Sequence, residues 1–97
     1  AWHRIPEPEL WIHINGEPTE LFTIEAGALK RTILHHKSVQ ATYRVPAHTW
    51  MAARPMGEWS LQVCALTPPF SEMELASREM MRSSFPAIQE LPNLFHE

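Results

Sequence analysis

Residues 2–16 spell WHRIPEPELWIHING, and the second half of this segment has the pattern of a short β-strand. The run L-W-I-H-I (residues 10–14) is apolar and aromatic with one histidine inside it, and residues of these types are enriched in strands. Pro8 precedes the run and the turn-forming pair Asn15-Gly16 follows it. We therefore predict a strand at residues 10–14 that is bounded by a turn on each side.

The same pattern continues through the first two thirds of the chain. Short alternating runs lie between prolines and glycines, with Ala26-Gly27-Ala28 as a predicted hairpin connection. Strands at a spacing of roughly 8–12 residues are typical of an all-β sandwich or barrel. The further predicted strands are residues 19–25, 29–35, 39–45, 49–54 and 59–66.

The last third has a different character. Pro68-Pro69 ends the last predicted strand, and Ser71 with Glu74 has the form of a helix capping box, with Ser77 as a second possible N-cap. We predict short helices at residues 77–84 and at about 86–91. A chain of 97 residues forms a single core. We expect one domain over residues 1–97, with a β core (1–67) and a C-terminal helical extension (68–97).

Composition excludes several classes of function. The chain carries 8 basic and 11 acidic residues, so its net charge of −3 does not favour nucleic acid as a partner. It has no apolar run of membrane-spanning length. Cys64 is the one cysteine, which points to a reducing compartment, and we expect a cytoplasmic protein. Because Cys64 lies between apolar residues in its predicted strand, we expect it to be a buried small hydrophobe.

Two groups of histidines differ in what they predict. His3 and Glu9 flank Pro6-Glu7-Pro8, and a turn there could bring them to one face of neighbouring strands. Such a pair can bind a metal, share a proton, hold a ligand, or make a purely structural contact. By contrast, His13 lies alone on its strand face, and His35-His36 point to opposite faces of a strand. We expect no metal from these three.

Four tryptophans are many for this length. With Tyr43, they could line an aromatic ligand pocket or could simply fill a small core, and the two interpretations are compatible. The four are Trp2, Trp11, Trp50 and Trp59.

Four blocks, in order, resemble the cupin-5 family of uncharacterised cupin-like proteins. They are WHRIPEPELWIHINGEP (2–18), VPAHTWMAAR (45–54), WSLQVCALTPPF (59–70) and ELASREMMRSSFP (74–86). The resemblance implies a cupin-type double-stranded β-helix, a jelly roll that closes around one pocket. The family's N-terminal region precedes the first block. Because this chain begins at Ala1 without an initiator Met, we expect that N-terminal strands are missing.

The resemblance also assigns positions in the cupin motifs. His3, Glu9 and Gly16 match the first motif, but Ile5 stands at its second histidine, and Met51 stands where the second motif has a metal-binding histidine. Apolar side chains at two ligand positions do not complete a site for a hard divalent metal. We therefore expect no cofactor, with His3 and Glu9 as the remaining candidates for a divalent metal. His48 replaces a family glycine, so that position is a candidate for positive φ.

We expect from these residues a protein that binds a small polar or carbohydrate-like ligand in the barrel pocket. The alternatives are a cofactor-independent sugar isomerase or epimerase, in which a histidine acts as base, and a metal-dependent cupin enzyme. We also expect a homodimer, because open sheet edges favour pairing and cupins commonly dimerise through their sheets. The sequence assigns no catalytic residue. The pocket candidates are His3, Glu9, Trp11, Tyr43, Trp50 and Met51.

Overall fold

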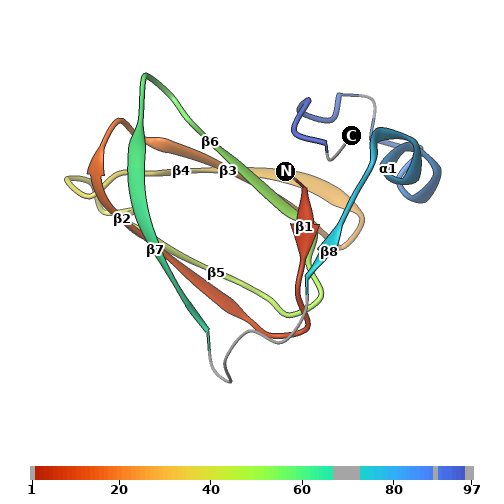
Figure 1. Cartoon of the computed structure of the whole chain (residues 1–97), viewed down its shortest axis with the longest axis horizontal. Coiled ribbons are helices and arrows are strands. Elements are labelled where there is room, and N and C mark those ends of the chain that lie inside the picture. Colours follow the sequence, from red (N-terminus) through yellow and green to blue (C-terminus); the bar gives the residue numbers. More distant parts are fainter. Residues whose placement is uncertain (1, 67–72, 89, 96–97) are drawn as a thin grey trace.

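A computed structural model describes residues 2–66, 73–88 and 90–95, which form two antiparallel sheets and one helix (Figure 1). The five-stranded sheet has the order β4-β3-β6-β1-β8 and the three-stranded sheet the order β5-β2-β7. The elements are β1 (His3–Arg4), β2 (Glu9–Gly16), β3 (Thr19–Glu25), β4 (Ala28–Leu34), β5 (Thr42–Val45), β6 (Met51–Pro55), β7 (Ser60–Leu66), β8 (Glu74–Leu75) and α1 (Arg78–Ser84). None of the helices in the described ranges is long and apolar enough to cross a membrane.

Two glycines adopt backbone conformations with positive φ at points where the chain turns. Strands β3 and β4 are joined by Ala26 and Gly27, with φ of 53° and 76°, which is the geometry of a tight two-residue hairpin turn. The predicted hairpin connection is therefore confirmed. At Gly16 the φ is 85°, and a Cβ there would lie 2.6 Å from the ring of Trp59. Only glycine allows the end of β2 to pass this close to the start of β7.

Successive side chains of a strand point to opposite faces of the sheet, and the apolar ones therefore form two separate clusters. The inner cluster lies between the two sheets and contains Ile5, Trp11, Leu21, Leu34, Val45 and Met51. The outer cluster lies on the other face of the five-stranded sheet, where α1 and the segment after it cover it (Figure 1). Its buried members are Trp2, Phe22, Ile24, Trp50, Ala52, Ala76 and Met81. Three of the four tryptophans are thus buried, and Trp59 is half exposed.

Helix α1 begins where the sequence predicts. Ser77 is its N-cap, and the Ser77 Oγ accepts a hydrogen bond from the Met80 amide at 3.2 Å. Met81 is fully buried in the outer cluster, which fixes the helix against the sheet. The predicted helix at 86–91 is not formed in the described part of that segment, because Pro86 and Ala87 make a turn instead. Ser71 lies outside the described residues, and Glu74 belongs to β8, a strand that the sequence did not predict.

The turn between β4 and β5 is longer than expected. The sequence predicted strands at 29–35 and 39–45, but β4 ends at Leu34 and β5 begins at Thr42. The His35 amide donates to the Gln40 carbonyl at 3.0 Å, and the Ser38 amide donates back to the His35 carbonyl at 3.0 Å. These local bonds satisfy the backbone within a turn, so that Val39 lies entirely in solvent. The prediction that His35 and His36 lie in a strand is therefore wrong.

Candidate functional site

His3 and Glu9 approach each other from opposite sheets. His3 pairs with Met51 across β1 and β6, so its side chain shares the inward face with the buried Met51. Glu9 begins β2 in the other sheet and is only 7% exposed. Burial raises the pKa of Glu9, and the neighbouring charge of His3 partly offsets that rise. The prediction of neighbouring strands is wrong, because the segment through Pro6 and Pro8 carries the chain from one sheet to the other.

Two buried polar atoms on the inward face of β2 have no hydrogen-bond partner among the residues that the structure describes. They are Oε1 of Glu9 and Nε1 of Trp11. Glu9 and Trp11 are two residues apart on one strand, so both side chains point between the sheets. A weak hydrogen bond from the indole N–H of Trp11 lowers the pKa of Glu9, but neither Nε1 of Trp11 nor Oε1 of Glu9 has a partner of ordinary hydrogen-bond length and angle. A buried polar atom left without a partner costs about 1–3 kcal/mol.

A polar network lies beside these atoms. Tyr43 of β5 pairs directly with Trp11, and its hydroxyl donates to Oε2 of Glu25 at 2.6 Å. The Thr23 hydroxyl donates to the same oxygen at 2.6 Å, and Nζ of Lys30 donates to the Tyr43 hydroxyl at 2.9 Å. Burial opposes the charge on Glu25, but these hydrogen bonds and the Lys30 charge together lower its pKa.

Glu25 and Lys30 were not among the residues that the sequence selected for the site. Thr23 and Glu25 continue the inward face that Leu21 begins, and Lys30 pairs with Thr23 across β3 and β4. Polar residues on an otherwise apolar strand face were the signal that could have found them.

Met51 and Trp50 are neighbours that point in opposite directions. Met51 is fully buried between the sheets, together with Trp11 and Ile5. Trp50 lies on the outer face of the same sheet, where the Arg4 guanidinium stacks 4.6 Å from the centre of its ring. The structure thus brings His3, Glu9, Trp11, Tyr43 and Met51 to the space between the sheets but does not bring Trp50 there.

Cys64 lies on the same inward side but is exposed. It pairs with Trp11 across β2 and β7, so both side chains are on one face of the sheet. The expectation of a buried thiol is therefore wrong. Although the residue as a whole is exposed, partial burial of its sulfur and the negative charge of Glu9 raise the pKa of Cys64 to about 12, so the thiol stays protonated at neutral pH. Its exposure means that solvent reaches the inward face along β7.

The inward residues do not fit a metal ion. Ile5 and Met51 occupy the two positions where the resemblance places ligands, and both are packed into the inner cluster. Among residues 2–66, 73–88 and 90–95, no group of three histidine, cysteine or acidic side chains is arranged to hold a metal. A thiol that stays protonated, such as Cys64, is also a poor ligand. What the site offers chemically is hydrogen bonding: buried acceptors, an indole donor and a tyrosine hydroxyl.

Comparisons with known proteins agree with this fold. A family model described as Cupin superfamily (DUF985), named Cupin_5, matches residues 1–76. Protein SO0799 from Shewanella oneidensis has a similar structure (TM-score 0.79, 20% identity, covering 90% of this chain and 60% of that one). So has a hypothetical protein from Leishmania major (TM-score 0.78, 17% identity, covering 89% and 62%). The chain therefore spans less than two thirds of each of these proteins. No curated protein matches it.

Proposed function

Because the chain belongs to the Cupin_5 family of the cupin superfamily, we propose that it binds a small, hydroxyl-bearing, carbohydrate-like molecule between its sheets without a resident metal ion. The observation that carries this proposal is the pair of partnerless buried atoms, Oε1 of Glu9 and Nε1 of Trp11. A buried donor and a buried acceptor that face the same space, next to an exposed β7, indicate a position that a polar group from outside can occupy.

A hydroxyl group matches both atoms at once. It accepts a hydrogen bond from the indole N–H of Trp11 through a lone pair and donates its own proton to the carboxylate of Glu9. A bare anion could not donate to Glu9, and an ammonium group could not accept from Trp11. Tyr43 lies directly across from Trp11, so a second hydroxyl of the same ligand has a further polar neighbour. These three residues favour a polyhydroxylated ligand over a charged one.

The test removes the indole N–H and keeps a six-membered aromatic ring at the position. We expect Trp11→Phe to weaken binding of the best ligand from a panel of free sugars by about 2–10-fold, the effect of losing one neutral hydrogen bond. Trp59→Phe is the matched control, since Trp59 is half exposed and lies outside the site. Titration calorimetry measures both affinities. No sugar bound by the wild type, or an equal loss in both variants, would contradict the proposal.

Affinity should also depend on pH through Glu9. Its pKa lies above the ordinary value of 4.5, so the carboxylate gains its proton earlier than a free glutamate as pH falls. A protonated Glu9 no longer accepts the ligand hydroxyl at full strength, and binding is expected to weaken in this range. Glu9→Gln should remove this dependence. Elemental analysis of protein purified without a chelator or an affinity tag tests the metal: near-stoichiometric metal would favour the metal-dependent alternative instead.

The enzymatic alternative rests on the closeness of His3 and Glu9. Their electrostatic interaction indicates that a candidate base and a candidate acid share one site, as an isomerase or epimerase needs. Incubation of ketoses or aldoses in heavy water separates this from simple binding. Solvent deuterium would appear at the carbon beside the carbonyl, and His3→Gln would abolish its incorporation while ligand binding persists.

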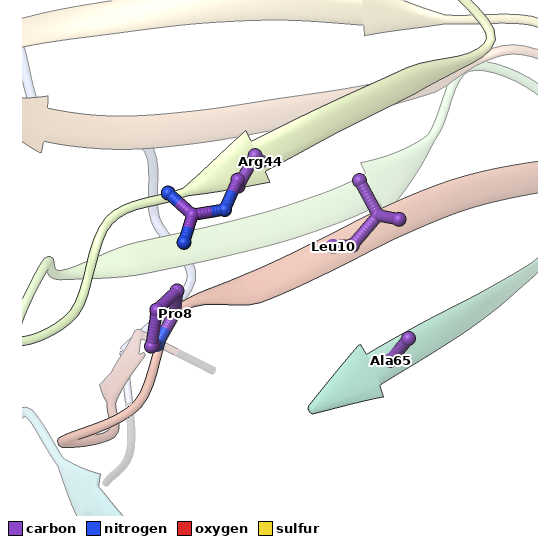
Figure 2. Close-up of a pocket in the computed structure, with 4 residues that line it drawn as sticks. All are labelled: Pro8, Leu10, Arg44 and Ala65. Atoms are coloured by element: carbon purple, nitrogen blue, oxygen red, sulfur yellow. The ribbon is translucent and has the colours of Figure 1, made fainter. Parts of the chain in front are cut away.

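We also propose that two copies associate through the outer face of the three-stranded sheet. This face carries apolar side chains that are about half exposed: Ile14, Leu61 and Val63. Next to them on this face is a pocket of 290 Å³ lined by Pro8, Leu10, Arg44 and Ala65, whose side chains are labelled in Figure 2. Exposed apolar patches of this kind are typical of protein interfaces, and a twofold axis would bury the patch of each copy against the other.

A further inference from the structure

His13 is buried and both of its ring nitrogens are engaged. It is 2% exposed, on the inward face of β2. Its Nε2 lies 2.7 Å from the carbonyl oxygen of Glu17, and its Nδ1 accepts the backbone N–H of His36 at 2.9 Å. A carbonyl oxygen only accepts, so the Nε2 of His13 must carry the hydrogen. The His13 ring is thereby fixed as one neutral tautomer with a bare Nδ1.

Two further imidazoles pack against this ring. The Nδ1 of His36 lies 3.1 Å from the Nδ1 of His13, and the two rings are nearly parallel at 13° with centres 5.1 Å apart. The ring centre of His35 is 5.3 Å from that of His13 and 4.7 Å from that of His36. Because the Nδ1 of His13 is bare, the Nδ1 of His36 must donate across the 3.1 Å contact. We call these three residues the histidine cluster.

We propose that the histidine cluster is a pH-sensitive clasp, which holds the turn at residues 35–41 against β2 while His13 is neutral and releases that turn in mild acid. A proton on the Nδ1 of His13 would point at the amide hydrogen of His36 and at the Nδ1–H of His36. Both hydrogen bonds to the Nδ1 of His13 would be lost. The amide N–H and the Nδ1–H of His36 would then face the new Nδ1–H of His13, with no acceptor among the three groups. The closed arrangement therefore offers no acceptor to a hydrogen on the Nδ1 of His13.

The surroundings of the cluster oppose further positive charge. Its own turn contributes His35, His36 and Lys37, and the β2–β3 connection contributes Glu17, whose side chain is exposed. From β7 the neighbour in register with His13 is Gln62, which is neutral and in turn accepts from the Thr19 hydroxyl. Burial, and then the charges of His35, His13 and Lys37, lower the pKa of His36.

The sign of the pH effect follows from the hydrogen bonds that a hydrogen on the Nδ1 of His13 would remove, and the lowered pKa of His36 has the same sign. A base whose pKa is lower in the folded protein than in the unfolded chain binds more protons after unfolding. The folded arrangement therefore loses stability as pH falls through the ordinary histidine range near 6.5. What opens first is expected to be local, since residues 35–41 are tied to β2 mainly by His13, through its side chain and through its amide, which donates to the Ala41 carbonyl at 2.9 Å.

The clasp has a second consequence at the proposed binding site. The turn joins β4, which carries Lys30, to β5, which carries Tyr43, and these two side chains are hydrogen-bonded at 2.9 Å. Release of the turn frees the ends of both strands, although the clasp itself does not depend on whether a ligand binds there.

Amide hydrogen exchange measured by NMR tests the proposal directly. Samples contain a chelator, so that the proton is the only cation that varies between about pH 7.5 and about pH 5. After correction for intrinsic rates, we expect the protection of the His36 amide to fall about tenfold or more, the effect of at least one pKa unit. Amides in the β3–β4 hairpin should lose much less. Equal protection of His36 at both pH values in the folded protein would overturn the proposal.

A pair of variants assigns the effect to His13. His13→Asn keeps an acceptor for the His36 amide but cannot titrate, so the loss of protection with acid should disappear. His48→Asn is the matched control, because His48 is exposed in another turn, and the loss should persist. An unchanged pH dependence in His13→Asn would contradict the clasp.

If His13→Asn does not fold, the wild-type protein still decides the question. Nitrogen chemical shifts of its imidazoles at about pH 7.5 should show His13 protonated at Nε2 alone. A hydrogen on its Nδ1 at that pH would overturn the proposal.

Discussion

His48 holds a backbone conformation that suits glycine better than histidine. Its φ is 58°, and its amide donates to the Ile5 carbonyl at 2.8 Å, a bond that needs no particular side chain. The left-handed region costs a residue with a Cβ about 1–2 kcal/mol. We expect His48→Gly to raise the free energy of unfolding in urea by up to about 1 kcal/mol, because the flexibility of glycine in the unfolded chain offsets part of the gain. Lower stability of the variant would show that the His48 side chain makes a contact that matters.

At the scale of single residues, the sequence predicted correctly that His3 and Glu9 lie close together, but it did not predict the geometry of their contact. Motif positions suggested His3 with Glu9, and the structure brings them together. It does so across the space between two sheets, which depends on where Pro6-Glu7-Pro8 leaves one sheet and enters the other. Likewise, Trp50 and Met51 are both apolar neighbours in one strand. The face of Met51 is the inner one because the three-stranded sheet packs against it, and the C-terminal segment covers the face of Trp50.

Helix α1 is held to the sheet mainly by one side chain. Met81 is fully buried in the outer cluster, whereas its neighbour Met80 is 36% exposed. Met81→Ala is expected to lower the free energy of unfolding by about 2–5 kcal/mol, the range for a large-to-small change in a core. Met80→Ala is the matched control and should change it by no more than about 0.5 kcal/mol. Chemical denaturation of both variants measures the difference. Equal effects would show that side chains other than Met81 hold the helix against the sheet.

Elements with strong local signals were predicted, and elements made by distant contacts were not. Six strands and the helix at Ser77 have alternation, turn residues or a cap in their own sequence, and all are found. Strand β8 has two residues and exists because His3 and Arg4 pair with Leu75 and Glu74. The turn at residues 35–41 replaced the start of a predicted strand because its amides find partners locally and around His13. Neither fact is visible in a window of neighbouring residues.

For the molecule as a whole, the dimer that we propose depends on the outer face of the three-stranded sheet. Val63 lies on that face and is 50% exposed, while Met56, 47% exposed, lies in the loop after β6 and serves as control. In sedimentation velocity at about 10 μM, a concentration that suits a micromolar dissociation constant, we expect a dimer for the wild type and for Met56→Lys. Val63→Lys should be a monomer. A monomeric wild type at this concentration would refute the dimer.

The tight turn at Ala26 and Gly27 also bears on the order of folding. Strands β3 and β4 pair from Glu25↔Ala28 outward to Thr19↔Leu34, so each new pair extends one already made and closes little additional loop. By contrast, β1 and β8 pair His3 with Leu75, two residues that are far apart along the chain. We expect the hairpin to belong to the folding nucleus and the β1–β8 pairing to form after the rate-limiting step. Substitutions in the hairpin should then slow folding, and substitutions in β8 should mainly speed unfolding.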